Sequence, residues 1–513
     1  MEYHYHINVA SPYIKNFLIF KGTLELPSWL LLSALAIFLT LQVLMYKKIK
    51  KFDISFKVKD ISTSKKTALL IALSLIFLIQ ISRLCNQEQI HPQEPIGLSL
   101  FGAYSSKLQS HDIKENPILE KLEEKSRASY TKNVRSESRN LILFVGDALR
   151  SDHMSIYGYQ KDTTPLLEKL AQSNQTLLIK GTRSTCAEST CGILSIIASR
   201  PLRFMPRNPI TLHEVLHING YRTILILSGD HTNFYGLKKL YGAVDEYHDG
   251  TDTEAYINDD ESVIEKIRSL PPFDKSQPVM LHFHLMSAHG LGARKKENIK
   301  YQPSSSYYTW KSSIKKEELF EESTENARNY YDNGVAQLDS TISRILHMLK
   351  EKGYLENTTV AITGDHGEML GEHAHFGHQR TVEEGVLSIP FIIQRYGYKE
   401  KTLGDWRVTS QTDIAPTLLE ELKIPAPSVW QGIALQKRAQ PRTTHFQQEH
   451  QVGIYWKSPT ELIKYWKNEK TQEEFAYRID QDKLETENII KSVPKTLLTI
   501  WRQEIIKTNT DQN

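Results

Sequence analysis

Two apolar stretches near the start of the chain stand out from a polar remainder. Pro27 to Tyr46 carries no charged side chain, and at about 1.5 Å rise per residue a helix of that length crosses a hydrocarbon core of about 30 Å. Thr67 to Ile81 is also apolar but shorter, so it needs its flanking residues to span the core. We predict two transmembrane helices, at about residues 27–46 and 67–84. A signal peptide is the poorer interpretation of the first stretch, because that stretch begins far along the chain and lacks an early basic region.

The loop between the two stretches is basic. It contains eight lysines but only two acidic residues, Asp53 and Asp60. Because loops rich in Lys and Arg stay in the cytoplasm, the chain after Arg83 is predicted to lie on the other side of the membrane. Residues 1–85 would then form a membrane anchor. The lysines are Lys47, Lys48, Lys50, Lys51, Lys57, Lys59, Lys65 and Lys66.

After the anchor, short β-rich apolar runs alternate with helical patterns. This alternation is typical of a parallel sheet whose strands are joined by helices. We therefore predict an α/β fold with a mostly parallel central sheet sandwiched by helices, over residues 140–513. Residues 86–139 are polar and contain prolines, so they are predicted to form a linker with one surface helix around LEKLEEKSR. The predicted strands lie in runs that begin at Asn140 and cover Tyr221 to His231, Pro278 to Gly290, Asn357 to Gly367 and Ser388 to Gln394.

The charge balance of the chain argues against one class of partner. The sequence has 63 Lys and Arg against 60 Asp and Glu. A nucleic-acid-binding protein needs a concentrated basic field, and a balance this even does not provide one. We predict no nucleic-acid partner.

Several polar residues fall at or just after the carboxyl ends of the predicted strands. Ligands of open α/β sheets collect at that edge, so these residues are expected to converge there. Each one alone is more simply read as a turn or capping residue. Together, carboxylates and imidazoles form the donor set of a hydrolytic divalent cation, and the imidazoles favour zinc over magnesium or calcium. They are Asp147, His284, His289, Asp365 and His366, and the last two open the His-rich segment GDHGEMLGEHAHFGHQR.

Cys186 and Cys191 lie five residues apart. An oxidising compartment outside the cytoplasm would allow them to pair. Two unpaired buried thiols fit the spacing equally well.

The order of these motifs resembles one group of enzymes. VGDALRSDHMSIYGYQKDTTPLLEKL, a Thr/Ser/Cys segment, HLMSAHG, YYDNGVAQLD and GDHGEMLGEHAHFGH follow one another, as similar motifs do in the phosphoethanolamine transferases that modify lipid A and other bacterial envelope glycans. Those transferases are members of the sulfatase and alkaline-phosphatase superfamily. The resemblance covers Asn140 to Leu435 and implies an alkaline-phosphatase-like fold.

The resemblance also implies roles for individual residues. Asp147 would be a metal ligand where the transferases use Glu, and Asp365 and His366 would bind the same metal. His289 and His378 match a histidine pair that binds the phosphate group or a second zinc. His284, Asn333 and Asp339 are weaker candidates for a supporting role.

The resemblance makes Thr190 the nucleophile and a ligand of the metal. In the transferases a Thr lies between two disulfide-linked cysteines, and Thr190 lies between Cys186 and Cys191, although Cys191 is adjacent. Ser189 and Cys186 are the alternatives. In true sulfatases a Cys or Ser within Cys-x-Pro-Ser-Arg becomes formylglycine, but CAEST has Glu188 in place of the Pro and Thr190 in place of the Arg. The maturation signal is therefore broken.

These observations predict a zinc-dependent transferase in the bacterial inner membrane, with a periplasmic catalytic domain. It would move phosphoethanolamine, or a related headgroup phosphate, from a phospholipid donor to an envelope glycan acceptor through a phosphothreonine intermediate. The second hypothesis is a membrane-anchored sulfatase or phosphodiesterase. The third is an inactive envelope protein that keeps only the fold.

Overall fold

The computed structural model describes most of the chain that follows the predicted anchor. Both predicted transmembrane helices and the basic loop lie outside the described residues. In the part that is described, no helix combines the length and the apolar character needed to cross a membrane. The described residues are 113, 116–132, 138–173, 175–253, 256–307, 321–399, 403, 408–437, 442–458 and 460–506.

A seven-stranded sheet with the order β2-β10-β7-β1-β6-β4-β5 forms the centre of the fold. β1 pairs in parallel with β6 on one side and with β7 on the other, and β4 continues the parallel pairing to β5. β10 runs antiparallel to both its neighbours. The prediction of a mostly parallel central sheet is confirmed. The strands are β1 (Asn140–Gly146), β2 (Thr176–Ile179), β4 (Arg222–Leu227), β5 (Glu246–His248), β6 (Val279–Leu285), β7 (Thr358–Gly364) and β10 (Phe391–Tyr396).

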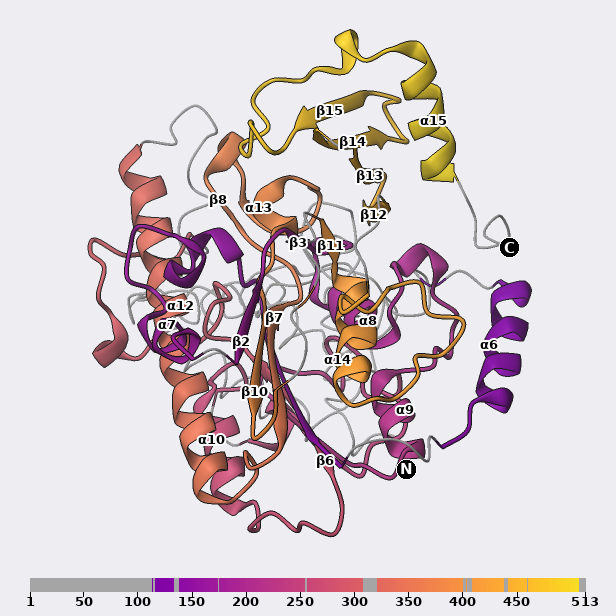
Figure 1. The fold of residues 1–513 in the computed structure, drawn as a ribbon. Helices are drawn as coiled ribbons and strands as arrows, with labels where there is room; N and C mark the ends of the chain where they lie inside the picture. The colour runs from indigo at the N-terminus through magenta and orange to yellow at the C-terminus, as the bar shows by residue number, and fades with distance from the viewer. Residues whose placement is uncertain are drawn as a thin grey trace, which may run out of the picture. The chain divides into compact units, whose positions relative to one another are not determined.

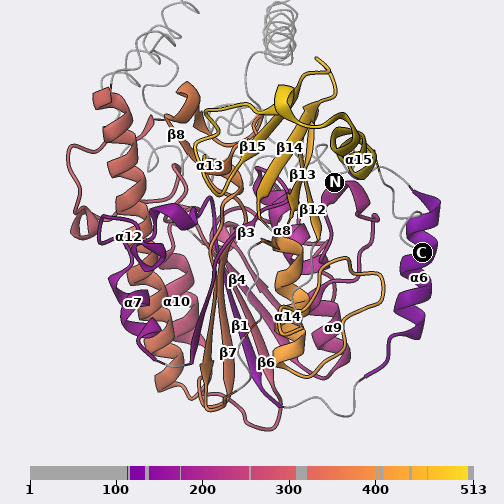
Figure 2. The ribbon, with the colours of Figure 1, turned by 45° about the horizontal axis from the view of Figure 1, so that its top comes forward.

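Helices cover both faces of this sheet (Figures 1 and 2). Side chains of β1 alternate between two cores, because successive residues of a strand point to opposite faces. Leu141 and Leu143 enter a core shared with α8, α9 and α14, whereas Ile142 and Phe144 enter a core shared with α10 and α12. A strand buried on both faces explains why the sequence shows a continuous apolar run there. The helices are α7 (Pro165–Ala171), α8 (Ser189–Ala198), α9 (Leu212–Ile218), α10 (Glu261–Ser269), α12 (Glu321–Glu351), α13 (Glu384–Leu387) and α14 (Ile414–Glu421).

A second sheet, which the sequence analysis did not predict, follows near the carboxyl end. It has four antiparallel strands, and α15 (Lys495–Ile506) covers one of its faces (Figure 1). Its other face packs on residues around α13. There the fully buried Lys464 ammonium lies 2.8 Å from Glu485 and 3.3 Å from Glu384, the first residue of α13. The strands are β12 (Thr443–Gln448), β13 (Gln451–Lys457), β14 (Leu462–Asn468) and β15 (Glu474–Arg478).

The helix predicted within the linker is α6 (Pro117–Ser129). Asn116 caps it by accepting hydrogen bonds from the N–H groups of Ile118 and Leu119, which offsets two unpaired helix donors. The buried Glu123 of α6 forms a 2.5 Å ion pair with Arg200. This helix therefore packs against the part of the chain that follows it and is not solvated on all sides.

The remaining elements are short. Two of them, β8 and β9, pair within the His-rich segment after β7. The short strands are β3 (Thr182–Arg183), β8 (Met369–Leu370), β9 (Phe376–Gly377) and β11 (Thr409–Ser410). The 3-10 helices are η2 (Ser151–His153), η3 (Ser155–Tyr157), η4 (Leu202–Phe204), η5 (Gly250–Asp252), η6 (Lys296–Asn298), η8 (Glu372–Ala374), η9 (Gln411–Asp413) and η10 (Ile490–Ser492).

Candidate active site

The register of the central strands brings the predicted carboxylates together. Gly146 of β1 pairs with Gly364 of β7, so the next residues, Asp147 and Asp365, leave the sheet side by side. The backbone N–H of Ala148 donates to Asp365 Oδ1 at 3.0 Å and fixes that carboxylate. Ala148 adopts a positive φ of 57°, an uncommon conformation for a residue with a side chain. The turn after β1 is thus shaped around the carboxylate pair.

Asp147, Asp365 and His366 form what we call the first cluster. One ligand atom from each lies within 4.8 Å of the others, and all three side chains are fully buried. His366 Nε2 lies 3.8 Å from Asp147 Oδ1 and 3.7 Å from Asp365 Oδ2. His366 Nδ1 bonds the carbonyl of Gly367 at 2.7 Å, which leaves Nε2 to face the carboxylates. The predicted ligands of one metal are therefore gathered in one place.

The unsatisfied atoms of this cluster fit a divalent cation. Asp147 Oδ1 and Asp365 Oδ2 are buried and have no hydrogen-bond partner among the described residues. Burial alone would raise the pKa of Asp365, but the neighbouring His366 and His284 outweigh that effect and hold it well below its usual value. Two buried carboxylates side by side with unpaired oxygens fit a bound cation that takes oxygen and nitrogen ligands.

Ser189 brings its hydroxyl to the first cluster. Ser189 Oγ lies 3.1 Å from His366 Nε2 and 3.3 Å from Asp147 Oδ2. It is the first residue of α8, and Gly192 lets this helix approach β7 closely, since a Cβ there would lie 2.3 Å from the carbonyl oxygen of Asp365. Thr190 is half-buried and has no hydrogen bond to the first cluster among the described contacts. The geometry favours Ser189, the alternative in the sequence analysis, over Thr190.

The loop before Ser189 is held at several points. Cys186 and Cys191 form a disulfide, so the Cys186 thiol is not available as a nucleophile. The second sheet also supports this loop. Gln448 of β12 accepts a hydrogen bond from the N–H of Ala187 at 3.0 Å, and the N–H of Gln447 donates to the carbonyl of Thr185 at 2.8 Å. The position of the hydroxyl therefore depends on residues close to the end of the chain.

His289, Glu368 and His378 form the second cluster. His378 Nδ1 bonds Glu368 Oε1 at 2.9 Å. Burial lowers the pKa of His378, but the charge and hydrogen bond of Glu368 outweigh it, so the net pKa is raised. Burial raises the pKa of Glu368, and the histidines more than compensate and lower it to about 2. The pair thus favours a charged imidazole beside a carboxylate. It lies next to the first cluster, because the ring centroids of His366 and His378 are 4.4 Å apart.

The hydrogen bonds of His289 decide which of its nitrogens carries the proton. The N–H of Leu291 donates to His289 Nδ1 at 3.1 Å, so Nδ1 must bear a lone pair. Burial lowers the pKa of His289, which favours the neutral ring. A neutral imidazole that accepts at Nδ1 carries its proton on Nε2. In that tautomer His289 presents an N–H donor at Nε2.

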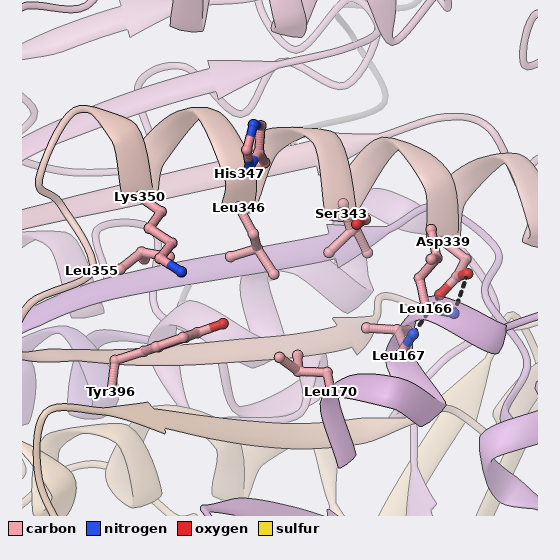
Figure 3. Close-up of a pocket in the computed structure, with 11 residues that line it drawn as sticks. Leu166, Leu167, Leu170, Asp339, Ser343, Leu346, His347, Lys350, Leu355 and Tyr396 are labelled. Carbon is pink, nitrogen blue, oxygen red and sulfur yellow. Dashed lines mark hydrogen bonds between the residues drawn. The ribbon is translucent and has the colours of Figure 1, made fainter. Parts of the chain in front are cut away.

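Two of the weaker sequence candidates lie away from both clusters. The Asp339 carboxylate accepts hydrogen bonds from the N–H groups of Leu166 and Leu167 at 2.9 Å each and so caps α7. It lines a cavity of about 310 Å³ whose other walls include Leu170 and Tyr396 (Figure 3). Asn333 Oδ1 accepts from the N–H groups of Lys300 and Tyr301. Both residues hold the structure together outside the site.

Three residues that the sequence analysis did not assign to the site belong to it or adjoin it. Tyr235 donates its hydroxyl hydrogen to Asp147 Oδ2 at 2.9 Å, and Glu368 completes the second cluster. His231 Nε2 lies 3.1 Å from Nδ1 of His284, the weaker candidate that the structure places at the first cluster. His231 is the last residue of the predicted run that contains β4 and lies just beyond the end of that strand at Leu227, so the strand-end rule could have singled it out.

Comparisons with known proteins agree with this arrangement. The model of the sulfatase family matches residues 139–424, more than half of the chain. The chain is similar to the phosphoethanolamine transferase EptA of Helicobacter pylori, at 24% identity over 67% of this chain and 65% of that protein. It is also similar to an arylsulfatase of Clostridium perfringens, at 29% identity over 32% of this chain and 36% of that protein. The chain thus spans less than two thirds of either relative.

Among solved structures, a 2-O GAG sulfatase superposes with a TM-score of 0.55 at 17% identity, covering 72% of this chain and 90% of that one. At that identity the superposition supports the fold alone.

Proposed function

The chain belongs to the sulfatase family, and from that premise we propose that it is a metal-dependent phosphoethanolamine transferase. It would move phosphoethanolamine, or a related headgroup phosphate, from a phospholipid to an envelope glycan. The single observation that carries this proposal is a serine hydroxyl at the first cluster where a sulfatase would need formylglycine. The formylglycine signal, read from Cys186 as CAEST, lacks its Pro and Arg, and Cys186 itself is paired with Cys191.

Asp147, Asp365 and His366 would hold the metal, which we propose to be zinc because the donor set mixes carboxylate with imidazole. When bound, the cation would lower the pKa of a coordinated hydroxyl and offset the charge of phosphoryl oxygens. Ser189 Oγ, within 3.3 Å of two of these ligands, is the hydroxyl in reach.

Ser189 would act as the nucleophile in two steps. In the first, the Ser189 oxygen, which would already be deprotonated because the cation would lower its pKa, bonds to phosphorus as the bond from phosphorus to the glycerol oxygen of the lipid breaks, leaving diacylglycerol and a phosphoethanolamine ester of Ser189. In the second, a glycan hydroxyl attacks phosphorus and the Ser189 oxygen leaves in its deprotonated form. The uncapped start of α8 offers backbone N–H groups to the phosphoryl oxygens in both steps.

The second cluster would move the proton and bind the phosphate. His378, kept charged by Glu368, can protonate the departing glycerol oxygen and then take the proton of the incoming glycan hydroxyl. The Nε2–H of His289 can donate to a phosphoryl oxygen, since its Nδ1 is occupied by Leu291. A second metal at this cluster would require His289 to give up that hydrogen bond.

We further propose that the catalytic part faces the periplasm from the inner membrane, which the disulfide between Cys186 and Cys191 supports. The anchor predicted at residues 27–46 and 67–84 would keep the enzyme beside its lipid donor.

The test is to incubate the full-length protein in liposomes with a fluorescent phosphatidylethanolamine, with and without a lipid A acceptor. We expect release of fluorescent diacylglycerol and a phosphoethanolamine adduct on Ser189 by mass spectrometry. Ser189→Ala should abolish the adduct and reduce turnover by about 10³-fold or more. Thr190→Val, the matched control one residue away, should keep most of the activity.

Two results would contradict this proposal in different ways. An adduct on Thr190 would show that Thr190, the residue implied by the resemblance, is the nucleophile. Rapid turnover of a nitrophenyl sulfate without any phospholipid cleavage would make the chain a sulfatase.

A further inference from the structure

A file of three buried side chains leads from the interior of the protein to the first cluster. Tyr241, His231 and His284 are all fully shielded from solvent. The Tyr241 hydroxyl lies 2.7 Å from His231 Nδ1, and His231 Nε2 lies 3.1 Å from His284 Nδ1. The far nitrogen of His284 then faces the carboxylates. The file therefore ends at the residues that would hold the metal.

The file ends at the first cluster with an imidazole nitrogen that has no hydrogen bond. His284 Nε2 lies 3.7 Å from Asp147 Oδ2 and 3.8 Å from Asp365 Oδ2. It is buried and has no hydrogen bond among the described residues. A buried polar atom is rarely left without a partner, so this nitrogen points to a ligand that lies between it and the carboxylates.

The two rings constrain each other's protons. For His284 Nε2 to offer a lone pair from a neutral ring, the proton must sit on Nδ1. Nδ1 then needs an acceptor, and it has two: the carbonyl oxygen of Ser228 at 3.2 Å and His231 Nε2 at 3.1 Å. His231 Nε2 can accept only if the His231 proton is on Nδ1. That proton in turn has one acceptor, the Tyr241 hydroxyl oxygen.

We infer that His284 is a further ligand of the metal bound by Asp147, Asp365 and His366, and that His231 and Tyr241 are positioning residues that fix its tautomer. The inference rests on the metal site of the proposed function. Hydrogen-bond partners behind a metal-binding histidine commonly set its ring orientation and strengthen binding, with losses of about 10- to 100-fold when they are removed. Here two such partners act in series.

Loss of the Tyr241 hydroxyl has a predictable direction. In Tyr241→Phe, a proton on His231 Nδ1 would face a phenyl ring, and a buried N–H without an acceptor is costly. His231 would then favour a proton on Nε2, which points at His284 Nδ1. His284 Nδ1–H would then keep only the Ser228 carbonyl oxygen as an acceptor, which His231 Nε2 also approaches at 3.2 Å, so the tautomer with a free Nε2 lone pair loses one of its two supports. A residue that does not touch the metal thereby weakens metal binding.

The test measures metal affinity and not catalysis. The full-length protein in detergent is stripped with a chelator, and the zinc Kd is obtained by competition with a chromophoric chelator. One equivalent of Co²⁺ per chain gives a visible absorption spectrum that reports the ligand set. The variants are His284→Ala, His231→Leu, Tyr241→Phe and the control Tyr354→Phe. The Tyr354 hydroxyl is a buried donor to the Pro271 carbonyl and lies outside this file.

We expect the zinc Kd to rise about 10-fold in Tyr241→Phe and up to about 100-fold in His231→Leu. His284→Ala should shift the Co²⁺ bands, and Tyr354→Phe should match the wild type. If circular dichroism shows that His231→Leu does not fold, the zinc Kd of the near-isosteric Tyr241→Phe tests whether the residues behind His284 affect metal binding.

A wild-type Kd in Tyr241→Phe and unchanged Co²⁺ bands in His284→Ala would overturn the inference alone, as long as the wild type binds zinc. A wild type that binds neither zinc nor Co²⁺ would overturn the proposed function and this inference together.

Discussion

The two histidine-containing clusters lie next to each other yet balance their charges in different ways. In the first, Asp147 Oδ1 and Asp365 Oδ2 have no hydrogen bond among the described residues, and neither does the adjoining His284 Nε2. In the second, Glu368 Oε2 is also without a hydrogen bond, but Glu368 Oε1 pairs directly with His378 at 2.9 Å, and the N–H of Leu291 donates to His289 Nδ1. The first cluster thus has two carboxylates to balance, whereas the single carboxylate of the second already has a histidine partner.

This difference separates two kinds of site that look alike in a sequence. Both are built from His and an acid after a strand, and both sets fit within metal-binding distances. Which one binds a metal depends on whether the carboxylates are already neutralised by a partner. The following predictions test that distinction.

The largest effect is expected from removing one charge of the first cluster. Asp365→Asn keeps the shape but removes a ligand charge, so the protein should lose its zinc and about 10³-fold or more of its activity. Elemental analysis and turnover in liposomes measure the two effects. Asp339→Asn, a buried carboxylate outside both clusters, is the control. Full zinc content in Asp365→Asn would contradict the assignment of the first cluster.

A smaller effect, with a pH signature, is expected at the second cluster. Glu368 raises the pKa of His378, so Glu368→Gln should lower it. If His378 acts in its charged form, activity is lost as pH rises through that pKa. The alkaline limb of the pH profile should therefore move to lower pH, with about 10²-fold lower activity above neutrality.

The zinc content of Glu368→Gln distinguishes the two interpretations of the second cluster. We expect it to equal that of the wild type. Loss of one zinc per chain, with no movement of the alkaline limb, would make the second cluster a metal site.

The smallest effect concerns a carboxylate with neither a metal nor a histidine. Burial raises the pKa of Asp339 to about 6. The pKa of an Asp in the unfolded chain is about 4. Between that pKa and the folded pKa, the folded protein binds more protons than the unfolded chain does, so the free energy of unfolding falls as pH rises through that window. Thermal melts in EDTA from pH 4 to 7 should show the stability of Asp339→Asn rising relative to wild type. Parallel curves would contradict the raised pKa, and activity should be unaffected throughout.

Much of the fold and of the first cluster could be predicted from the sequence. The apolar runs identified five of the strands of the central sheet, and the rule that ligands gather at strand ends placed Asp147 beside Asp365. The antiparallel direction of β10 could not be predicted, because a buried apolar run has no direction in its pattern. The second sheet was missed, because TTHFQQ alternates in burial while its residues are almost all polar, and QVGIYWK has four successive buried residues instead of an alternation.

The choice of nucleophile shows where sequence reasoning stops. Neighbouring residues on a helix point about 100° apart, so a shift of one residue decides which hydroxyl faces the metal ligands. α8 begins at Ser189, and this start turns Ser189 and not Thr190 to the first cluster. Resemblance to a family aligns the segment but cannot fix that rotation.

The support that Gln447 and Gln448 give to the loop before Ser189 has a consequence for how the protein comes into being. A ribosome makes the chain from the amino end, so the metal ligands and Ser189 emerge long before β12. Until that strand has been made and has docked, the loop from Thr185 to Ala187 lacks two of its backbone partners. β12, which is made after the residues of the first cluster and Ser189, thus completes their support, and a nascent chain or one truncated before β12 would carry those residues without this support.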